Sequence, residues 1–461
     1  MTKWSPDPAL LARPAYLSLA EQFSRAIDQG ALPAGARLSP QRRLADELGL
    51  SVQTVSRSYQ ELIRRGLITG EIGRGSFVLS PRHEARPPYL PERSGEVIDL
   101  SILKPVCEAM HLERMRHGLG WLSENLSAEA ATSFRPNTVF PRHRAVASDW
   151  LLRCGVEAAP GNVSITNGAT SAITAALMSV VPVGGSLAAE ALTHHTLMPL
   201  CGYLGVKLEG IGTDAEGMVP ASLDEAARRG SISAIYLQPT LINPQATLMT
   251  ADRRSELVEI ARRHDLAIVE NDILNVMVEN RPPPIAALAP ERTLYIAGFT
   301  KITVPGIRVA FLAVPDRYAT AVANRHLVTN WMATPAMVEL LSHWLTDGTA
   351  LELIGWQRNA LGERHAIARA ALAGVAYFDH PQSLHLWLPL PAGQGEDGFV
   401  ARCRLQGVAV AAGSAFRSTE RGRHDAVRIS LGPTSAADLD RGLRLIAGMV
   451  TESMEVPLPA I

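Results

Sequence analysis

The chain has 461 residues, of which 47% are hydrophobic and 19% are charged, and its formal net charge is −1. That length exceeds a single ordinary folding core, so we expect two or three globular domains. No apolar run approaches the roughly 18 residues of a membrane-spanning helix, and the residues 1–6 lack an apolar signal core, so cytoplasmic residence without a membrane partner is expected.

The distribution of charges and cysteines along the chain further limits the kinds of domain that it can contain. Residues 1–80 contain ten Lys/Arg and seven Asp/Glu, a net charge of +3, whereas the remaining residues contain 34 and 38, a net charge of −4. A mildly basic first region is compatible with a nucleic-acid-binding domain but does not prove one. The four cysteines are scattered without a C-x-x-C pair, which argues against a metal site and against a disulfide framework.

The first 80 residues predict three helices followed by a hairpin. The first helix follows Pro14 and stops at Gly30, the second runs from about Pro40 to Gly49, and the third is capped by Ser51. A hairpin is expected over 67–79. The apolar residues that recur at helical spacing, and are therefore expected to be buried, are Leu19, Phe23, Ile27, Leu44, Ala45, Leu48, Val55, Tyr59, Leu62 and Ile63.

A helix, a short turn with glycine and a capped helix have the spacing of a helix-turn-helix, and the hairpin would make it a winged version. The third helix would then expose Val52, Gln53, Ser56, Arg57 and Gln60. Short polar groups and an arginine suit base edges and phosphates in a major groove. Arg74, at the tip of the wing, could reach the backbone or the minor groove.

This region resembles the winged-helix domain of the GntR superfamily, because Thr54-Val55 and the segment 73–78 match its recognition helix and wing. The resemblance implies that Arg42 contacts DNA, and the expected DNA-binding residues are Arg42, Gln53, Thr54, Ser56, Arg57 and Arg74. Ser39 and Val52 depart from the proline and the arginine that are usual there, so the DNA sequence that is read stays open. The alternative is a three-helix interaction module that does not bind DNA.

Residues 81–96 are rich in proline and charge and lack an apolar period, which predicts an exposed connector. The expected domains are therefore a DNA-binding domain at 1–80 and a large domain at 97–461. In the large domain short apolar strands alternate with amphipathic helices, which predicts an α/β fold with a mostly parallel sheet covered on both faces. The predicted strands are 163–165, 186–189, 235–237, 267–269, 294–296 and 309–314.

Lysine is scarce in this chain, with four lysines against forty arginines, yet Lys301 is kept just after a predicted strand. Arg308 follows seven residues later. Only a primary amine forms a Schiff base with an aldehyde cofactor, so the choice of lysine there has a chemical reason. A surface lysine with no such role is the alternative on this stretch alone.

Other polar residues follow other predicted strands, where ligands gather in parallel sheets. The turn 167–171 opens a helix and exposes backbone N–H groups that can hold a phosphate. Asn243-Pro244 and Asp272 each come after a further strand. Each of these features alone is equally consistent with an ordinary turn or a helix cap.

Together these residues resemble fold type I pyridoxal-phosphate proteins of the aspartate aminotransferase class over about 97–450, and with the first domain the chain resembles MocR/GabR-type transcriptional regulators. The resemblance implies that Lys301 carries the cofactor as an internal aldimine and that Arg428 grips an effector carboxylate. It also implies a smaller C-terminal α+β subdomain. The cofactor-binding residues that it assigns are Lys301, Asp272 at the ring nitrogen, Asn243 at the phenolic oxygen, Arg308, Thr300, Ala169 and Thr170 at the phosphate, and His194 stacked on the ring.

Three positions depart from the enzyme pattern. Leu274 replaces a tyrosine that usually contacts the phenolic oxygen, Gly298 replaces a hydroxyl residue, and His194 replaces the commoner tyrosine. Because the lost tyrosine normally tunes proton transfer, we expect a sensor that forms an external aldimine with an amine or amino acid and seldom turns it over. The alternatives are an active pyridoxal-phosphate-dependent aminotransferase with an appended DNA-binding domain, and a DNA-binding protein whose large domain takes no cofactor.

The expected partners are a double-stranded DNA operator, an amine effector and a second copy of the chain. The resemblance implies a homodimer in which each DNA-binding domain lies over the partner chain and a partner residue completes the phosphate pocket. Taurine, an ectoine-derived amine, γ-aminobutyrate and pyridoxal phosphate itself all remain open as effectors.

Overall fold

The computed structural model describes residues 4–28, 31–33, 35–65, 67–71, 75–78, 97–132, 141–418 and 425–451. The chain divides into two units, Met1–Arg93 and Ser94–Ile461, which are called the head and the body below. This division falls inside the predicted connector 81–96. The connector and Arg74 lie outside the described residues, so the domain bounds and the wing-tip contact stay predictions. In the described ranges no helix is long and apolar enough to cross a membrane.

The head contains the three predicted helices and the predicted hairpin, and a single 3-10 turn, η1 (Pro8–Leu10), precedes them. The helices are α1 (Ala15–Asp28), α2 (Gln41–Leu48) and α3 (Val52–Arg64), and the strands are β1 (Ile68–Glu71) and β2 (Gly75–Val78). The strands pair antiparallel, with Ile68 opposite Val78. A winged helix-turn-helix is therefore the architecture of the head.

Local sequence signals explain the turn between α2 and α3. Gly49 ends α2 with a φ of 64°, a left-handed conformation that glycine adopts without a steric penalty. Ser51 then caps α3, because its side chain accepts a 3.1 Å hydrogen bond from the amide of Thr54. The prediction that Ile63 is buried is wrong: its exposed fraction is 44%, because the buried stripe of α3 runs through Val55 and Leu62 and leaves Ile63 at its edge.

The body is built on a seven-stranded sheet with the order β4-β12-β11-β10-β9-β5-β6. All strands run parallel except β12, which pairs antiparallel with β4 and with β11. The predicted mostly parallel sheet is thus confirmed. The strands are β4 (Val163–Thr166), β5 (Ser186–Glu190), β6 (Lys207–Ile211), β9 (Ile232–Leu237), β10 (Ala267–Asn271), β11 (Thr293–Gly298) and β12 (Ala310–Ala313).

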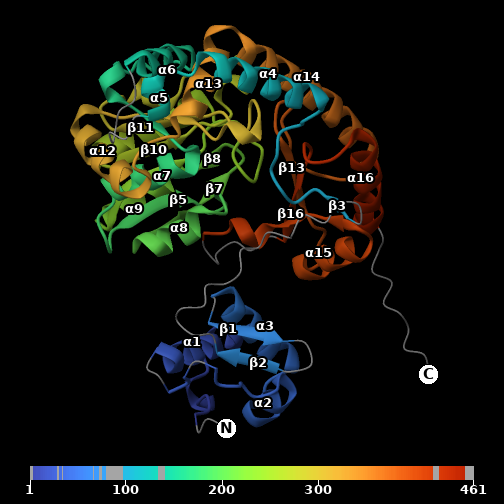
Figure 1. Cartoon of the computed structure of the whole chain (residues 1–461). Coiled ribbons are helices and arrows are strands. Elements are labelled where there is room, and N and C mark those ends of the chain that lie inside the picture. The colour runs from blue at the N-terminus through green and yellow to red at the C-terminus, as the bar shows by residue number, and fades with distance from the viewer. Residues whose placement is uncertain are drawn as a thin grey trace. The chain divides into compact units, whose positions relative to one another are not determined.

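Helices cover both faces of this sheet, which is why β10 and β11 are buried along their whole length and β9 at every residue except Ser233 (Figure 1). Alternate residues of each strand pack in opposite directions: Val269 joins the cluster under α7, α8 and α12, whereas Ile268 joins the cluster under α9, α10 and α11. These helices are α7 (Ala169–Val180), α8 (Leu197–Leu204), α12 (Asp316–Asn330), α9 (Pro220–Arg228), α10 (Ala251–Arg263) and α11 (Ile285–Leu288). Near β4 and β12 the sheet packs on α6 (Pro141–Arg153).

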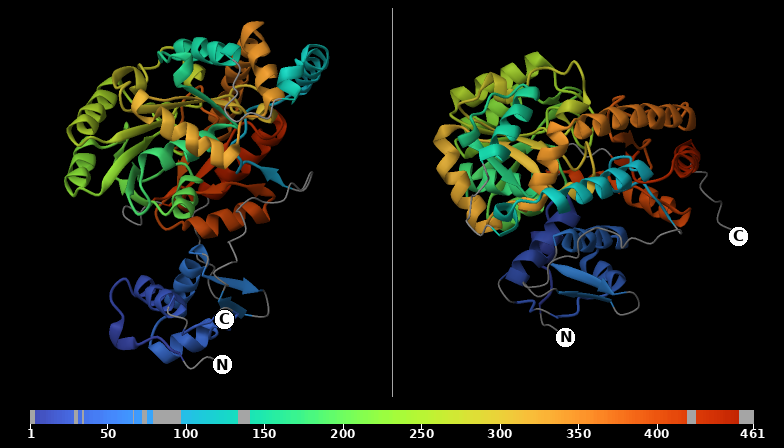
Figure 2. Two further views of the ribbon diagram at one scale, coloured as in Figure 1. Left: turned by 60° about the vertical axis from the view of Figure 1, so that its left-hand side comes forward. Right: turned by 45° about the horizontal axis from the view of Figure 1, so that its top comes forward.

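A smaller subdomain follows the long helix α14 (Thr349–Ala371), which leads away from α13 (Pro335–Thr346) beside the large sheet (Figure 1 and Figure 2). Its three-stranded sheet has the order β13-β16-β15, and the first body strand, β3 (Ile98–Asp99), pairs with β14 (Val408–Ala409) nearby. The other strands are β13 (His385–Pro389), β15 (Ala411–Ala412) and β16 (Ala426–Ser430), packed on α15 (Glu396–Leu405) and α16 (Ala436–Thr451).

Candidate functional site

The carboxyl ends of the parallel strands bring the predicted site residues of the body to one edge of the large sheet. Lys301 lies three residues beyond β11, Asp272 directly follows β10, and His194 lies four residues beyond β5. Arg308 stands just before β12, and because that strand is antiparallel, its start lies at the same edge. The strand order therefore places residues that are more than 100 positions apart in sequence side by side.

Lys301 lies in a cationic and partly buried environment. Its amine donates a hydrogen bond to the carbonyl oxygen of Leu103. Burial, with the positive charges of Arg428 and Arg308, lowers the pKa of the Lys301 amine to about 8. A larger share of this amine is therefore neutral and nucleophilic near neutral pH than for an exposed lysine.

Asp272 is completely buried, and its two carboxylate oxygens differ in their surroundings. One oxygen, Oδ2, accepts a 2.9 Å hydrogen bond from the hydroxyl of Tyr295 and lies 3.2 Å from a guanidinium nitrogen of Arg281. The other oxygen, Oδ1, has no hydrogen-bond partner among the described residues. A buried oxygen without a partner is costly, so Oδ1 marks a place where a ligand donor fits.

The turn after β4 and the arginine before β12 form an anion cradle. Gly168 has a φ of 83° and caps α7 without a side-chain bond, which leaves the first N–H groups of the helix, at Ala169 and Thr170, available to an anion. A Cβ atom on Gly168 would lie 3.1 Å from a guanidinium nitrogen of Arg308, so the guanidinium lies directly against this turn. Thr300 is partly buried beside Lys301.

Arg428 reaches this edge from β16 of the smaller subdomain. Its guanidinium donates a 3.1 Å hydrogen bond to the side-chain oxygen of Asn243 and a 2.6 Å hydrogen bond to the carbonyl oxygen of Ser101. The guanidinium carbon lies 4.7 Å from the ring centroid of Phe416, at cation–π distance. Two subdomains and the first loop of the body therefore meet at this arginine.

Two adjacent histidines, His194 and His195, lie close enough to Lys301 and Arg428 to feel their charges. His194 hydrogen-bonds to the hydroxyl of Thr196 at 2.8 Å, and the ring of His195 meets Phe416 edge-on, with the centroids 5.8 Å apart. Burial, followed by the positive charges of the site, holds the pKa of His194 well below its ordinary value and lowers that of His195 to about 4. Both rings are therefore neutral near pH 7, so they add no positive charge to the site.

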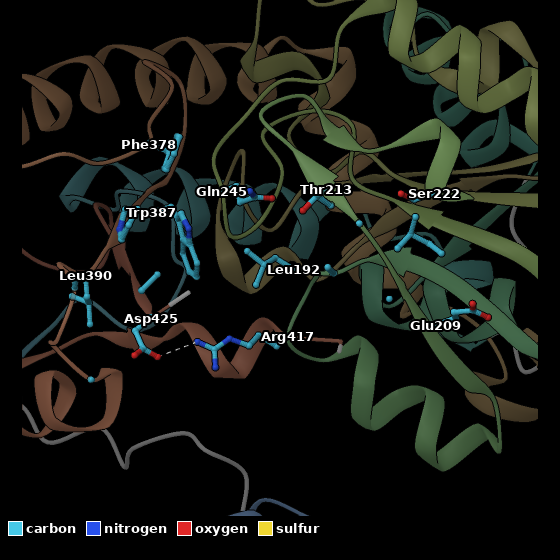
Figure 3. Close-up of a pocket in the computed structure, with 18 of the residues that line it drawn as sticks. Leu192, Glu209, Thr213, Ser222, Gln245, Phe378, Trp387, Leu390, Arg417 and Asp425 are labelled. Atoms are coloured by element: carbon cyan, nitrogen blue, oxygen red, sulfur yellow. Dashed lines mark ion pairs between the residues drawn. The ribbon is translucent and has the colours of Figure 1, made fainter. Parts of the chain in front are cut away.

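A cavity of about 1140 Å³ lies between the edge strand β6 and the smaller subdomain (Figure 3). Leu192, Gln245, Trp387 and Arg417 are among the residues that line it, and none of the predicted site residues does. Backbone bonds join the segment 191–193 to the segment 416–418, from the amide of Thr193 to Phe416 and from that of Ser418 to Ala191. Leu192 and Trp387, which line the cavity, belong to the same apolar cluster as Phe416, the ring that lies against Arg428 of the candidate site.

The predicted DNA-contacting residues of the head lie at its surface. Arg42 on α2 and Gln53 and Arg57 on α3 are exposed, and Ser56 is partly exposed. The guanidinium of Arg57 lies 4.8 Å from the ring centroid of Tyr16, on α1. Thr54 is less free than predicted, because its hydroxyl is hydrogen-bonded to Ser51 at 2.8 Å as part of the helix cap.

Comparison with known proteins finds two families in the chain. Residues 15–78 match the model of bacterial regulatory proteins of the gntR family, and residues 122–446 match that of aminotransferases of class I and II. The body belongs to the class I and II aminotransferase family. It is joined to a GntR-family DNA-binding head, so the architecture expected from the MocR/GabR-type resemblance is confirmed.

Individual relatives share this layout. The chain is 26% identical over 460 residues to the uncharacterized HTH-type transcriptional regulator YdeF of Bacillus subtilis, covering 97% of each chain. It is 23% identical over 364 residues to the HTH-type pyridoxine biosynthesis transcriptional regulator PdxR of Corynebacterium glutamicum, covering 77% and 78%. Kynurenine aminotransferase of Pyrococcus horikoshii has the same body fold, with a TM-score of 0.70 at 22% identity over 77% of this chain and 91% of that chain.

The residues at the sheet edge fit pyridoxal phosphate, the cofactor of this aminotransferase family. Lys301 offers an amine, and the unpartnered Oδ1 of Asp272 suits the ring nitrogen. The cradle between Gly168 and Arg308 suits a phosphate group.

The structure also gives a physical reason for two departures from the enzyme pattern. A Cβ atom at Gly298 would lie only 2.9 Å from the Cγ2 atom of Ile273, so a hydroxyl residue does not fit there without a shift. Leu274, in the place of the usual tyrosine, is buried in an apolar cluster that includes Phe299 and Ile302. In this family member, apolar packing around Gly298 and Leu274 therefore takes the place of the two polar contacts that the usual hydroxyl residue and tyrosine make.

Sequence reasoning missed four side chains at this site: Arg281, Tyr295, His195 and Phe416. The sequence assigns Tyr295 only to an apolar strand, and Arg281 is one of forty arginines and stands before a run of prolines. Only the adjacency of His195 to His194 was a usable signal. The contacts of Arg281 and Phe416 are set by tertiary packing and leave no local pattern in the sequence.

Proposed function

We propose that this chain is a pyridoxal-phosphate-dependent, DNA-binding transcriptional regulator whose body senses an amine or amino acid. The observation that carries the proposal is a partly buried lysine, Lys301, near the charges of Arg428 and Arg308, in a chain that also has a winged helix-turn-helix. The similarity of the chain to the HTH-type transcriptional regulators YdeF and PdxR supports the same conclusion.

The cofactor supplies an aldehyde that amines attack and an aromatic ring that accepts charge. Lys301 would attach the cofactor through its neutral amine, and Asp272 and Asn243 would bind the ring nitrogen and the phenolic oxygen. The start of α7, with Ala169 and Thr170, would hold the phosphate together with Arg308 and Thr300, and His194 would cover one ring face.

Arg428 would bind the acidic group of the effector, and the amine of the effector would take the place of the Lys301 amine. Lys301 would then be released, and Arg428, which contacts both subdomains and the loop at Ser101, would change these contacts to bind the effector. A change in the angle between the subdomains is therefore a direct route from effector to DNA binding. Such coupling requires that the effector bind two states of the body unequally.

Sensing rather than turnover is supported by Leu274. Its buried side chain leaves no hydroxyl at the position where the enzymes of this family usually have a tyrosine. We further propose that the regulator acts in the cytoplasm as a homodimer in which each head lies over the partner chain, as the MocR/GabR-type resemblance implies.

The test combines two measurements on the full-length protein with its cofactor. Taurine, γ-aminobutyrate and an ectoine-derived amine are titrated while the absorbance of the bound cofactor and the affinity for an operator duplex, selected from random sequence, are recorded. We expect one class of amine to change both, and Lys301→Ala to abolish both responses while keeping DNA affinity without effector. Steady keto-acid production at ordinary enzyme rates would instead favour an active aminotransferase, and a colourless protein would exclude the proposal.

A further inference from the structure

The carboxylate of Asp272 forms an ion pair with Arg281, a residue that has no role in the proposed function described above. Arg281 lies 3.2 Å from Oδ2, the same oxygen that accepts the Tyr295 hydrogen bond, whereas Oδ1 is left without a partner in the described part of the chain. The side chains of Asp272 and Arg281 are 0% and 10% exposed, so little solvent screens this pair.

Packing fixes Arg281 in this position. Its second guanidinium nitrogen donates a 2.5 Å hydrogen bond to the carbonyl oxygen of Cys154, at the end of α6. Three prolines follow Arg281 in sequence, and a Cβ atom on Gly155 would lie 3.2 Å from the ring of Pro284, so the two loops are in direct contact. The carboxylate of Asp272 raises the pKa of Arg281 despite its burial, and the guanidinium stays charged.

The other charged and titratable groups around Asp272 come from β10, α10, β11 and the end of α6. At the end of α6, burial followed by the charge of Asp272 raises the pKa of the Cys154 thiol, which stays neutral. Glu270 on β10 accepts hydrogen bonds from the amides of Ile285 and Ala286, at 2.9 and 2.8 Å, and burial followed by the charge of Asp272 raises its pKa to about 7. Arg254 on α10 is buried, and its guanidinium donates to four backbone carbonyls. Tyr295 on β11 stays neutral, because burial, followed by the charge of Asp272, holds its pKa well above the ordinary value.

We propose that Arg281, with Tyr295, is a positioning residue that holds the carboxylate of Asp272 in place, aims its Oδ1 at the cofactor and opposes a proton on the ring nitrogen. This inference rests on the proposed function and deepens it. The carboxylate attracts a proton on the ring nitrogen, and the guanidinium behind the carboxylate repels it. The ring nitrogen is therefore less basic beside this ion pair than beside an isolated aspartate.

The expected consequence is that the amine can still attach to the cofactor while its chemical conversion becomes slower. A ring nitrogen that is only partly protonated withdraws electrons less strongly, so a proton on the carbon next to the bound amine is removed more slowly. Attachment of the amine depends on Lys301 and Arg428 and is not affected by this weakening. Arg281 would thus favour a body that reports an amine over one that converts it.

The protonation of the ring nitrogen is measured directly by NMR of full-length protein loaded with pyridoxal phosphate that carries ¹⁵N in the ring, over a pH series. Arg281→Gln should raise the pKa of the ring nitrogen by about one unit or more relative to the wild type. Arg281→Lys keeps the charge and should remain close to the wild type. Arg253→Gln is the matched control, because Arg253 is 11% exposed and pairs with Asp214 at 2.8 Å outside the site.

An Arg281→Gln protein that binds the cofactor with an unchanged ring-nitrogen titration would overturn the inference. If that variant does not fold, Tyr295→Phe decides: loss of its hydrogen bond to Oδ2 should raise the pKa in the same direction by a smaller amount, and no rise would refute the role of this pair. A wild type that takes up no cofactor would instead refute the proposed function, so the two failures are distinguishable.

Discussion

The side chains of Asn243 and Arg428 come from different subdomains of the body and share a 3.1 Å hydrogen bond from the guanidinium to the amide oxygen. Because that oxygen accepts from Arg428, the amide nitrogen of Asn243 points elsewhere and can donate to a ligand. Arg428 itself is 2% exposed and lies beside Phe416. Asn243, proposed to bind the cofactor, and Arg428, proposed to bind the effector, therefore hold each other in position.

Arg428→Met should weaken binding of amines that carry an acidic group by about 1.5–3 kcal/mol, or roughly 10- to 150-fold. The reason is loss of a charge-assisted hydrogen bond in a buried site. Amines without an acidic group should lose much less, which titration of the cofactor absorbance with matched pairs of amines measures. Arg444→Met, at an exposed ion pair with Asp440 on α16, is the control. Equal losses for both kinds of amine would contradict the assignment of Arg428.

Uptake of pyridoxal phosphate by the cofactor-free protein should depend on pH through Lys301. The amine reacts when it is neutral, and its pKa is lowered from 10.5 to about 8. The rate of uptake should therefore rise with pH up to about 8 and level off above it, as stopped-flow absorbance can follow. In Arg428→Met the midpoint should move to higher pH, because one of the charges that lowers the pKa is gone. A rate in the wild type that keeps rising toward pH 10 would be evidence against a perturbed lysine.

Gly168→Ala should reduce affinity for the cofactor as well as stability. At a φ of 83° an alanine costs about 1–2 kcal/mol, and its Cβ atom would also push against the Arg308 guanidinium at 3.1 Å. Gly184→Ala is a matched control, since Gly184 has a φ of 80° and nothing within 4 Å of a Cβ atom. Both variants should melt at lower temperature, but only Gly168→Ala should lose cofactor affinity. Similar affinities in the two variants would mean that the turn at Gly168 does not hold the phosphate.

Gly298→Ser restores the hydroxyl that related enzymes often have, and it should destabilise this protein. The new Cβ atom would stand 2.9 Å from Ile273, a contact that side chains essentially never show. Adding Ile273→Ala should relieve the clash, so the double variant should be less unstable than the sum of the single changes. Chemical denaturation of the four proteins measures this coupling. Additive losses would show that Ile273 does not explain the glycine.

The sequence predicted the fold well where structure follows local periodicity. All six predicted strands of the body are present, because short apolar runs between helices are typical of the buried strands of a mostly parallel sheet; the sixth, β12, runs antiparallel. The same rule brought Lys301, Asp272 and His194 together, because each follows a strand of that sheet. The sequence does not predict the contacts that depend on tertiary packing, namely Arg281 with Asp272 and Phe416 with Arg428. The partners are only 9 and 12 residues apart in sequence, but loops and subdomains orient them and leave no periodic signal.

Arg57→Ala should weaken DNA binding without changing the cofactor absorbance. The Arg57 side chain is exposed on α3 and supported by the ring of Tyr16, whose centroid lies 4.8 Å from the guanidinium carbon. If Arg57 reads a base, the loss should be about 1–3 kcal/mol and should depend on sequence; if it contacts a phosphate, the slope of log affinity against log salt should fall by about 0.9. Fluorescence anisotropy with a selected duplex at several salt concentrations separates these cases. Arg25→Ala, on α1 beside Glu21, is the control, and an Arg57 variant that binds as tightly as this control would show that α3 is not the helix that enters the groove.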